Sequence, residues 1–170
     1  MLCACSRRDT VCIDRKAGDY PIKVFTAEVG TRRPLGVGAG SLAVLGSMPD
    51  DEAVAVIEAL KGHLKSYPEQ LRRGILPSVR AARKAGYAVS DGLVLPSVIG
   101  VGVAIRDRRG VAIGTLGIAS FKDSGSDRRI AEYAAMLMCE QARIERVLRD
   151  KFAAAVKSPA PASRRPSLRA

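Results

Sequence analysis

Apolar residues recur along this chain at two spacings, every second residue in some segments and every third or fourth residue in others. Leu2 to Ser6 and Thr10 to Lys16 show the two-residue period that is typical of strands, with a charged turn between them. Ile22 to Val29 repeats that period. Because consecutive strands joined by short turns pair side by side, we expect a sheet that is at least partly antiparallel.

The helical spacing begins after Pro49. Three acids, Asp50 to Glu52, follow this proline, and both features favour a helix N-terminus. The spacing predicts a helix to about Leu64, ended by Tyr67 and Pro68. Its apolar face would carry Val54, Ile57, Leu60 and Leu64. Residues 69 to 73 would form a second short helix. A third would run from Pro77 to Lys84, before Gly86 turns the chain.

Two apolar runs from Ile99 to Ser120 predict a hairpin around the turn Asp107 to Gly110. If the loop consists of Arg108 and Arg109, Gly100 faces Gly117 across the pair. In the same register Gly102 faces Thr115 and Ala104 faces Ile113. One face of the hairpin is then densely apolar, with Val101, Val103, Ile105, Leu116 and Ile118, and the other is nearly bare around Gly100, Gly102, Gly117 and Ala119.

The bare face has two interpretations, which the residues alone leave open. A helix backbone packs closely against the glycines, or the glycines mark bulges. Alternatively the missing side chains leave a chamber for a ligand, since protein interiors are otherwise close-packed.

A last helix is expected from Ser124–Ser126 to about Asp150. Residues 157 to 170 contain three prolines and lack periodic apolar positions, which predicts a disordered tail. We therefore expect one domain over residues 1–150, followed over 151–170 by the end of the last helix and this basic tail. The apolar surface of the last helix, widened by Met136, Met138 and Cys139, favours self-association.

The net charge of +11 raises the possibility of a nucleic-acid partner. Five of these charges follow Asp150, and the others fall largely in turns such as Arg7-Arg8, Arg32-Arg33 and Arg108-Arg109, as on a solvated surface. With only three Phe and four Tyr, few aromatics are available to stack on bases. The sequence therefore does not predict that the folded domain binds nucleic acid directly.

Candidate chemistry is sparse. The four cysteines form no CxxC pair and the one histidine, His63, lies in a surface-type helix, so we expect no metal site, no cofactor and no catalysis. The run from Gly36 to Ser41 is similar to a phosphate loop but lacks the GxGxxG spacing and the following Lys-Ser/Thr pair. Apolar stretches end before about 18 residues, so a cytoplasmic protein without membrane spans is expected.

Two segments resemble the effector-binding domain of the IclR family of bacterial transcriptional regulators. They are GTRRPLGVGAGSLAVL, from Gly30 to Leu45, and GYAVSDGLVLPSVIGVGVAIRDRRGVAIGTLGIAS, from Gly86 to Ser120. The resemblance covers roughly residues 2 to 150. It implies an α+β, GAF-like domain with a central, mainly antiparallel sheet flanked by helices.

The resemblance also implies a site and a function. Pocket-lining positions of the family correspond to Gly38, Ala39, Ser41, Ser90, Gly100, Gly117 and Ala119. Because these side chains are small and weakly polar, the implied partner is a small organic effector that is aromatic or otherwise weakly polar. A homo-oligomer is implied as well.

The winged helix-turn-helix that reads DNA in this family would lie before Met1. We therefore expect an effector-sensing domain without its own DNA-binding domain, reaching DNA only indirectly or through a missing upstream domain. The alternatives are a stand-alone ligand-binding or partner-regulating module, and a remnant of a truncated regulator.

Overall fold

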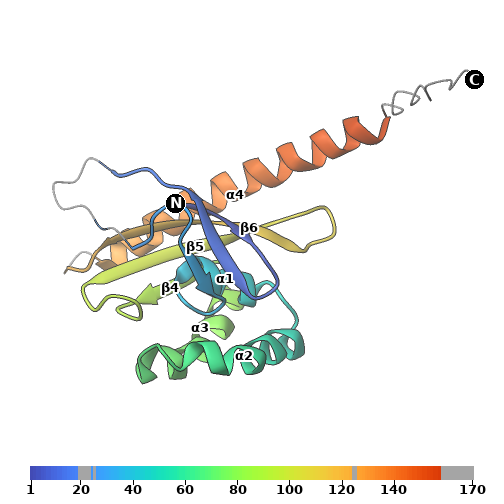
Figure 1. Ribbon diagram of the computed structural model, residues 1–170. Helices are drawn as coiled ribbons and strands as arrows, with labels where there is room; N and C mark the ends of the chain where they lie inside the picture. The colour runs from blue at the N-terminus through green and yellow to red at the C-terminus, as the bar shows by residue number, and fades with distance from the viewer. Residues whose placement is uncertain (19–23, 25, 124–125, 158–170) are drawn as a thin grey trace, which may run out of the picture.

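The computed structural model describes residues 1–18, 24, 26–123 and 126–157 as one α+β domain (Figure 1). Ten elements follow in the order β1 (Leu2–Cys5), β2 (Asp9–Asp14), β3 (Arg32–Pro34), α1 (Ala39–Gly46), α2 (Asp50–Leu64), α3 (Glu69–Ala85), β4 (Ala88–Asp91), β5 (Val98–Arg106), β6 (Ala112–Phe121) and α4 (Ser126–Lys157).

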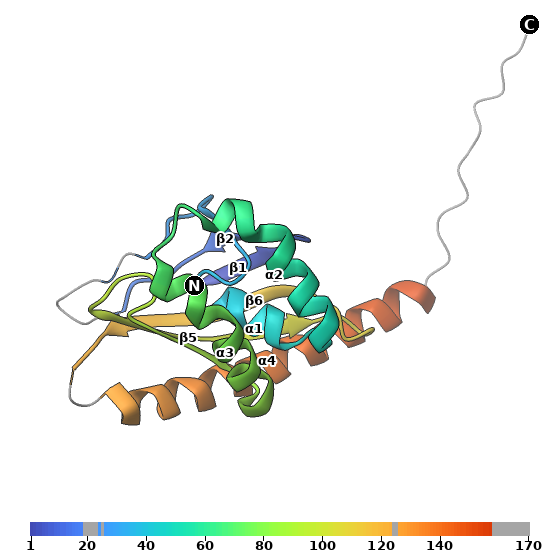
Figure 2. The same ribbon diagram turned by 90° about the horizontal axis from the view of Figure 1, so that it is seen from below.

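The six strands form one antiparallel sheet in the order β3-β2-β1-β6-β5-β4. Helix α4 covers one face of this sheet, and α1 and α3 lie on the other, with α2 outside them (Figures 1 and 2). The predicted fold class is confirmed: an antiparallel sheet is flanked by helices.

The first two strands form where the sequence predicts them, but the third does not. Residues 26–29 are not in a strand, and the rest of the predicted segment, apart from Val24, lies outside the described residues. The partner of β2 is β3 instead. The Cys12 N–H donates to the Thr31 carbonyl at 3.0 Å, and the Gly30 N–H donates to the Cys12 carbonyl at 2.8 Å. The edge of β2 therefore pairs with the residues just after the predicted strand.

Helix α2 has the predicted bounds, with Pro49 as its N-cap. Its buried face differs by one position, because Ala53 is buried and Val54 is 41% exposed. Leu60 and Leu64 are buried as predicted.

The two short helices predicted around Pro77 are a single helix, α3, and that prediction was wrong. Its apolar face continues through the proline, with Leu71, Ile75 and Val79 all at most 1% exposed. Proline inside a helix costs about 3 kcal/mol, and burying three large side chains provides about 1.5–3 kcal/mol each. Helix α3 ends at Gly86, whose φ of +81° favours glycine.

The β5–β6 hairpin has a longer loop than predicted. Gly100 pairs with Ala119 and Gly102 with Gly117, not with Gly117 and Thr115, so the predicted register was wrong by two residues. An irregularity after Ile105 and a wide turn cause the shift.

In the turn, burial alone would raise the pKa of Asp107, but the N–H groups of Val111 and Arg109 donate to its carboxylate and lower that pKa overall.

A shift of two residues leaves each side chain on its predicted face. Val101 and Val103 are fully buried against Ala134 and Leu137 of α4, with Leu116 and Ile118 beside them. Helix α4 continues to Lys157, beyond the end predicted near Asp150, and its last turns project from the domain (Figure 1). The predicted disorder of the tail concerns residues that, from 158 on, lie outside the described part. No helix within the described residues is long and apolar enough to span a membrane.

Candidate functional site

The site predicted from the sequence lies where α1 begins. Gly36 and Gly38 precede the helix with φ of +97° and +89°, a backbone region that side chains disfavour. Gly38 supplies the N-cap but no side-chain hydrogen bond, and the first turn contains no acidic residue. Since Leu42 is the first N–H to bond within the helix, to Gly38 at 3.1 Å, the N–H groups before it have no intrahelical partner.

At Gly102 the helix backbone presses against the sheet. A Cβ atom at this position would lie 2.6 Å from the nitrogen of Gly40 and 2.7 Å from the carbonyl carbon of Ala39. Close helix packing, one of the two interpretations of the bare face, therefore applies at Gly102.

One row further along the strands, the same face is open. Ser90, Gly100 and Ala119 pair in line across β4, β5 and β6. A Cβ at Gly100 would make only ordinary contacts, 3.4 Å to Ala39 and 3.7 Å to Ser90. A cavity of about 40 Å³, here named the α1 cavity, lies over this row. That volume holds about two or three waters.

Six of the seven predicted site residues line the α1 cavity together: Gly38, Ala39, Ser90, Gly100, Gly117 and Ala119. The seventh, Ser41, is buried elsewhere, and its hydroxyl shares a 3.1 Å hydrogen bond with the hydroxyl of Thr10. This bond ties α1 to β2 and leaves Ser41 with a structural contact outside the cavity.

Ser90 differs from Ser41 in having no partner. The residue is only 5% exposed and lines the α1 cavity, and within the described residues its hydroxyl makes no hydrogen bond. The unused hydrogen-bonding capacity is thus directed at the cavity.

Arg33 is a cavity residue that the sequence reasoning missed. It was assigned to a solvated turn, but it lies in β3, is half-buried and lines the α1 cavity. Its guanidinium donates to the Thr26 carbonyl and lies 3.8 Å from the Cβ position of Gly38. A basic residue just before the turn into α1 was the available signal. Arg33 brings a positive charge to the side of the cavity where the free N–H groups of α1 also lie.

A second, larger cavity of about 430 Å³ adjoins the first. We name it the β6 cavity, because Gly117 to Phe121 of β6 line it, together with Tyr133 of α4. The two cavities share Met1, Thr26, Gly117, Ile118 and Ala119. Only the larger falls in the volume range of 300–1,000 Å³ that is usual for small-molecule sites.

The thiols near this face are poorly suited to act as nucleophiles. Burial raises the pKa of Cys3 and raises that of Cys5 to about 11, so neither forms a thiolate readily at neutral pH. Among the described residues no three His, Cys, Asp or Glu side chains gather as metal ligands. His63 is exposed near the end of α2.

No family model matches the sequence, and no curated protein matches it. Solved structures do. The chain is similar to the IclR of Thermotoga maritima, with 23% identity, a TM-score of 0.76, and coverage of 86% of this chain and 60% of that one. It is similar to the repressor BlcR of Agobacterium tumefaciens, with 20% identity, a TM-score of 0.68, and coverage of 86% and 58%. The chain thus spans about three fifths of each of these regulators.

The C-terminal domain of the E. coli transcriptional regulator KdgR is matched over most of its own length. The identity is 24% and the TM-score 0.62, with coverage of 85% of this chain and 83% of that domain. The part of the regulators that this chain matches is therefore mainly their C-terminal, effector-binding domain. The resemblance seen in the sequence is confirmed at the level of the fold: this chain has the fold of the effector-binding domains of IclR-family transcriptional regulators.

Proposed function

We propose that this chain is the sensing domain of a transcriptional regulator and that it binds a small organic effector between α1 and the β4–β5–β6 surface. The observation that carries the proposal is Ser90, a residue only 5% exposed whose hydroxyl is unpartnered within the described residues and open to the α1 cavity. The shared fold supports a regulatory sensing role. The sequence of the DNA would be read by a domain or chain outside these 170 residues.

The two cavities suggest the shape of the effector. The α1 cavity has room for a small polar group, and Ser90, Arg33 and the free N–H groups of α1 are all donors suited to a carboxylate or hydroxyl. The β6 cavity next to it offers apolar side chains, including Ile118, Phe121 and Tyr133, beside the charged residues Arg15, Lys16, Asp123 and Arg129. We infer a ligand with one acidic or hydroxyl head and an aromatic or aliphatic body.

A thermal-shift experiment with benzoate, octanoate and pyruvate tests this inference. Ligand at about 100 times its Kd adds about 2.7 kcal/mol to the free energy of unfolding, which in a chain of this size raises the Tm by about 5–10 °C. We expect benzoate or octanoate to raise the Tm and pyruvate, which has no body for the β6 cavity, to have little effect. Failure of all three at millimolar concentration would contradict the proposal.

Two variants locate the binding. Ser90→Ala should leave the Tm of the free protein within about 2 °C, because the hydroxyl has no partner to lose, and should reduce the ligand-induced shift. Gly100→Leu should fold and lose the shift, since its side chain would occupy the α1 cavity. Gly62→Leu is the matched control, because Gly62 of α2 faces open space. An unchanged ligand shift in Gly100→Leu would refute the site.

Self-association is part of the proposal. Met136 of α4 is 63% exposed and Met138 is 41% exposed, which leaves apolar surface on both flanks of the buried stripe of α4. We expect a dimer or larger assembly by light scattering, and a shift toward the monomer in Met136→Glu. A wild-type protein that is monomeric at high concentration would contradict this part.

A further inference from the structure

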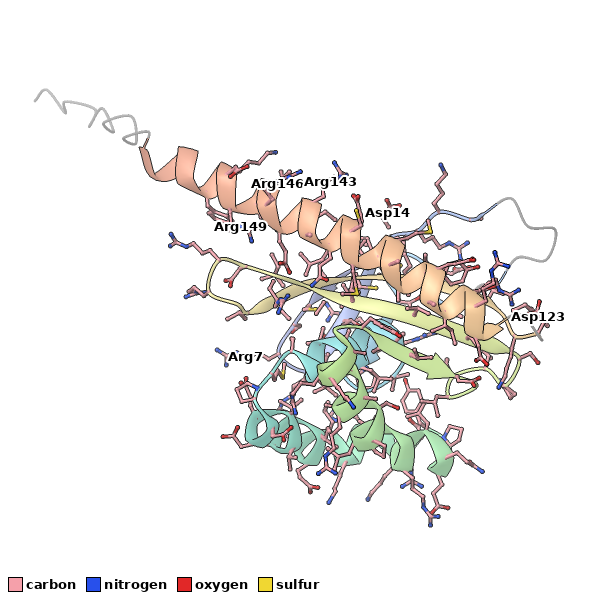
Figure 3. The ribbon with its side chains drawn as sticks, turned by 180° about the vertical axis from the view of Figure 1, so that it is seen from behind. Arg7, Asp14, Asp123, Arg143, Arg146 and Arg149 are labelled. Carbon is pink, nitrogen blue, oxygen red and sulfur yellow. The ribbon has the colours of Figure 1, made fainter. Side chains whose placement is uncertain are left out.

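The end of the molecule that carries the β5–β6 hairpin turn also carries the β1–β2 turn and the projecting part of α4. Figure 3 shows Arg143, Arg146 and Arg149 along this part of α4 and Arg7 at the same end of the domain. The backbone N–H of Arg106 donates to the Glu145 carboxylate at 2.9 Å, which fixes the base of the hairpin turn beside α4.

This hydrogen bond places the arginines of the hairpin turn and those of α4 at a similar level along the axis of α4. Arg108 lies two residues beyond Arg106, or about 7 Å along an extended chain. Arg149 lies one helical turn beyond Glu145, or about 6 Å along the axis. The tip of the hairpin and the arginines of α4 therefore form one continuous surface, here named the basic end.

Within the described residues, six cations of the basic end lack the partners that cations at the other end of α4 have. At the other end of the helix, Arg128 pairs with Glu132 at 2.9 Å and Arg129 with Asp123 at 2.7 Å. Within the described residues, no hydrogen bond or ion pair involves the side chains of six exposed cations at the basic end: Arg7, Arg8, Arg108, Arg146, Arg149 and Lys151.

The acids at this end are largely occupied. Glu145 is held by Arg106, Asp107 accepts from Arg109 and Val111, and Glu140 pairs with Arg143. Asp150 is the remaining acid on this part of α4. An excess of positive charge is left uncompensated and points into solvent.

We propose that the basic end binds the phosphate backbone of nucleic acid without reading its sequence. Five of the six unpartnered cations are arginines, and the planar guanidinium donates two parallel hydrogen bonds to a phosphate, which an ammonium cannot do. A helix and a hairpin tip that project from the domain place these groups against an extended polyanion. Phe152 is an exposed aromatic nearby, too little for a base-stacking platform.

The proposal is independent of the effector site. Gly100 lies six residues from Arg106 along β5, about 20 Å from the basic end, so the effector cavities and this surface do not overlap. In the sequence, Arg7-Arg8 and Arg108-Arg109 fall in separate turns that are typical of a solvated surface. The basic end could not be predicted from them, because only the fold brings the two turns and α4 together.

Fluorescence anisotropy of the full chain with a labelled duplex of about 20 base pairs and random sequence tests the proposal. If about four phosphates are contacted, the affinity should fall about 100-fold between about 50 and 200 mM salt. The double variant Arg108→Glu with Arg149→Glu should weaken binding at low salt at least 10-fold and reduce the salt slope by about two.

The matched control is Arg72→Glu with Arg80→Glu, which makes the same change in net charge at exposed positions of α3. It should retain at least half of the wild-type affinity. An equal loss in the α3 variant, or wild-type binding by the Arg108/Arg149 variant, would overturn the proposal. So would binding to vesicles containing phosphatidylserine with no binding to the duplex under the same salt conditions.

Discussion

Replacing Gly102 and Gly100 by alanine, one at a time, distinguishes the closed part of the small-residue surface from its open part. Both glycines lie in β5, both point to α1, and neither has a positive φ, so the added methyl group is the only difference. At Gly102 the methyl would meet the backbone of α1 at 2.6 Å, well inside the 3.4 Å at which ordinary contact begins. At Gly100 the closest atom is at 3.4 Å.

The expected magnitudes differ in sign. Overpacking a close-packed region costs about 1–3 kcal/mol, and α1 cannot move easily because Leu42, Val44 and Leu45 are at most 1% exposed. Gly102→Ala should therefore lower the Tm by about 2–12 °C for a chain of this size. Gly100→Ala should be neutral or raise the free energy of unfolding by up to about 1 kcal/mol, since alanine restricts the unfolded chain more than glycine does.

Urea unfolding followed by circular dichroism measures both variants against the wild type. The difference between them should be at least about 1 kcal/mol, with Gly102→Ala the less stable. Equal stability of the two variants would refute the reasoning, because it would mean that α1 does not press on the sheet at Gly102 or does not leave room at Gly100.

Three further changes test other parts of the structure. Pro77→Ala should raise the free energy of unfolding by about 1–3 kcal/mol, because the exposed proline supplies no N–H for a helical hydrogen bond inside α3. Lower stability in urea unfolding would contradict a continuous helix. At pH 8 a thiol reagent should label exposed Cys139 rapidly and Cys5 slowly. Cys5 should react faster only as the pH approaches its pKa of about 11. Rapid labelling of all four thiols would contradict the burial of β1 and β2. Deleting residues 157–170 should leave the Tm within a few degrees, since their composition offers no apolar face, and a loss corresponding to about 2 kcal/mol or more would mean that the tail docks.

Much of the hairpin could be predicted from the sequence, and its error has a physical cause. Alternation with period two assigned Val101 and Val103 to the face under α4, and it assigned Gly100 and Gly102 to the opposite face. The register depends instead on loop geometry. The turn after Arg106 is longer than two residues, with Gly110 at a φ of +81°, and periodicity alone cannot count such residues.

The small residues of the candidate site could be predicted from the sequence, whereas its charged residue could not. Six of the seven residues carried over from the family resemblance line the α1 cavity together, whereas Ser41 bonds to Thr10 across the α1–β2 contact. Whether these residues bind an effector remains the proposal. Arg33 was missed because a basic pair before a proline is typical of an exposed turn, and only pairing of β3 with β2 brings its side chain over the cavity.

The most direct test of the effector site is a crystal structure of the chain with whichever of benzoate or octanoate raises its Tm. The account predicts that the head of the ligand contacts the Ser90 hydroxyl and the N–H groups at the start of α1, that Arg33 faces it, and that the body lies along Gly117 to Phe121. A ligand bound elsewhere on the domain, with Ser90 still unpartnered and the space beside Gly100 still empty, would contradict it.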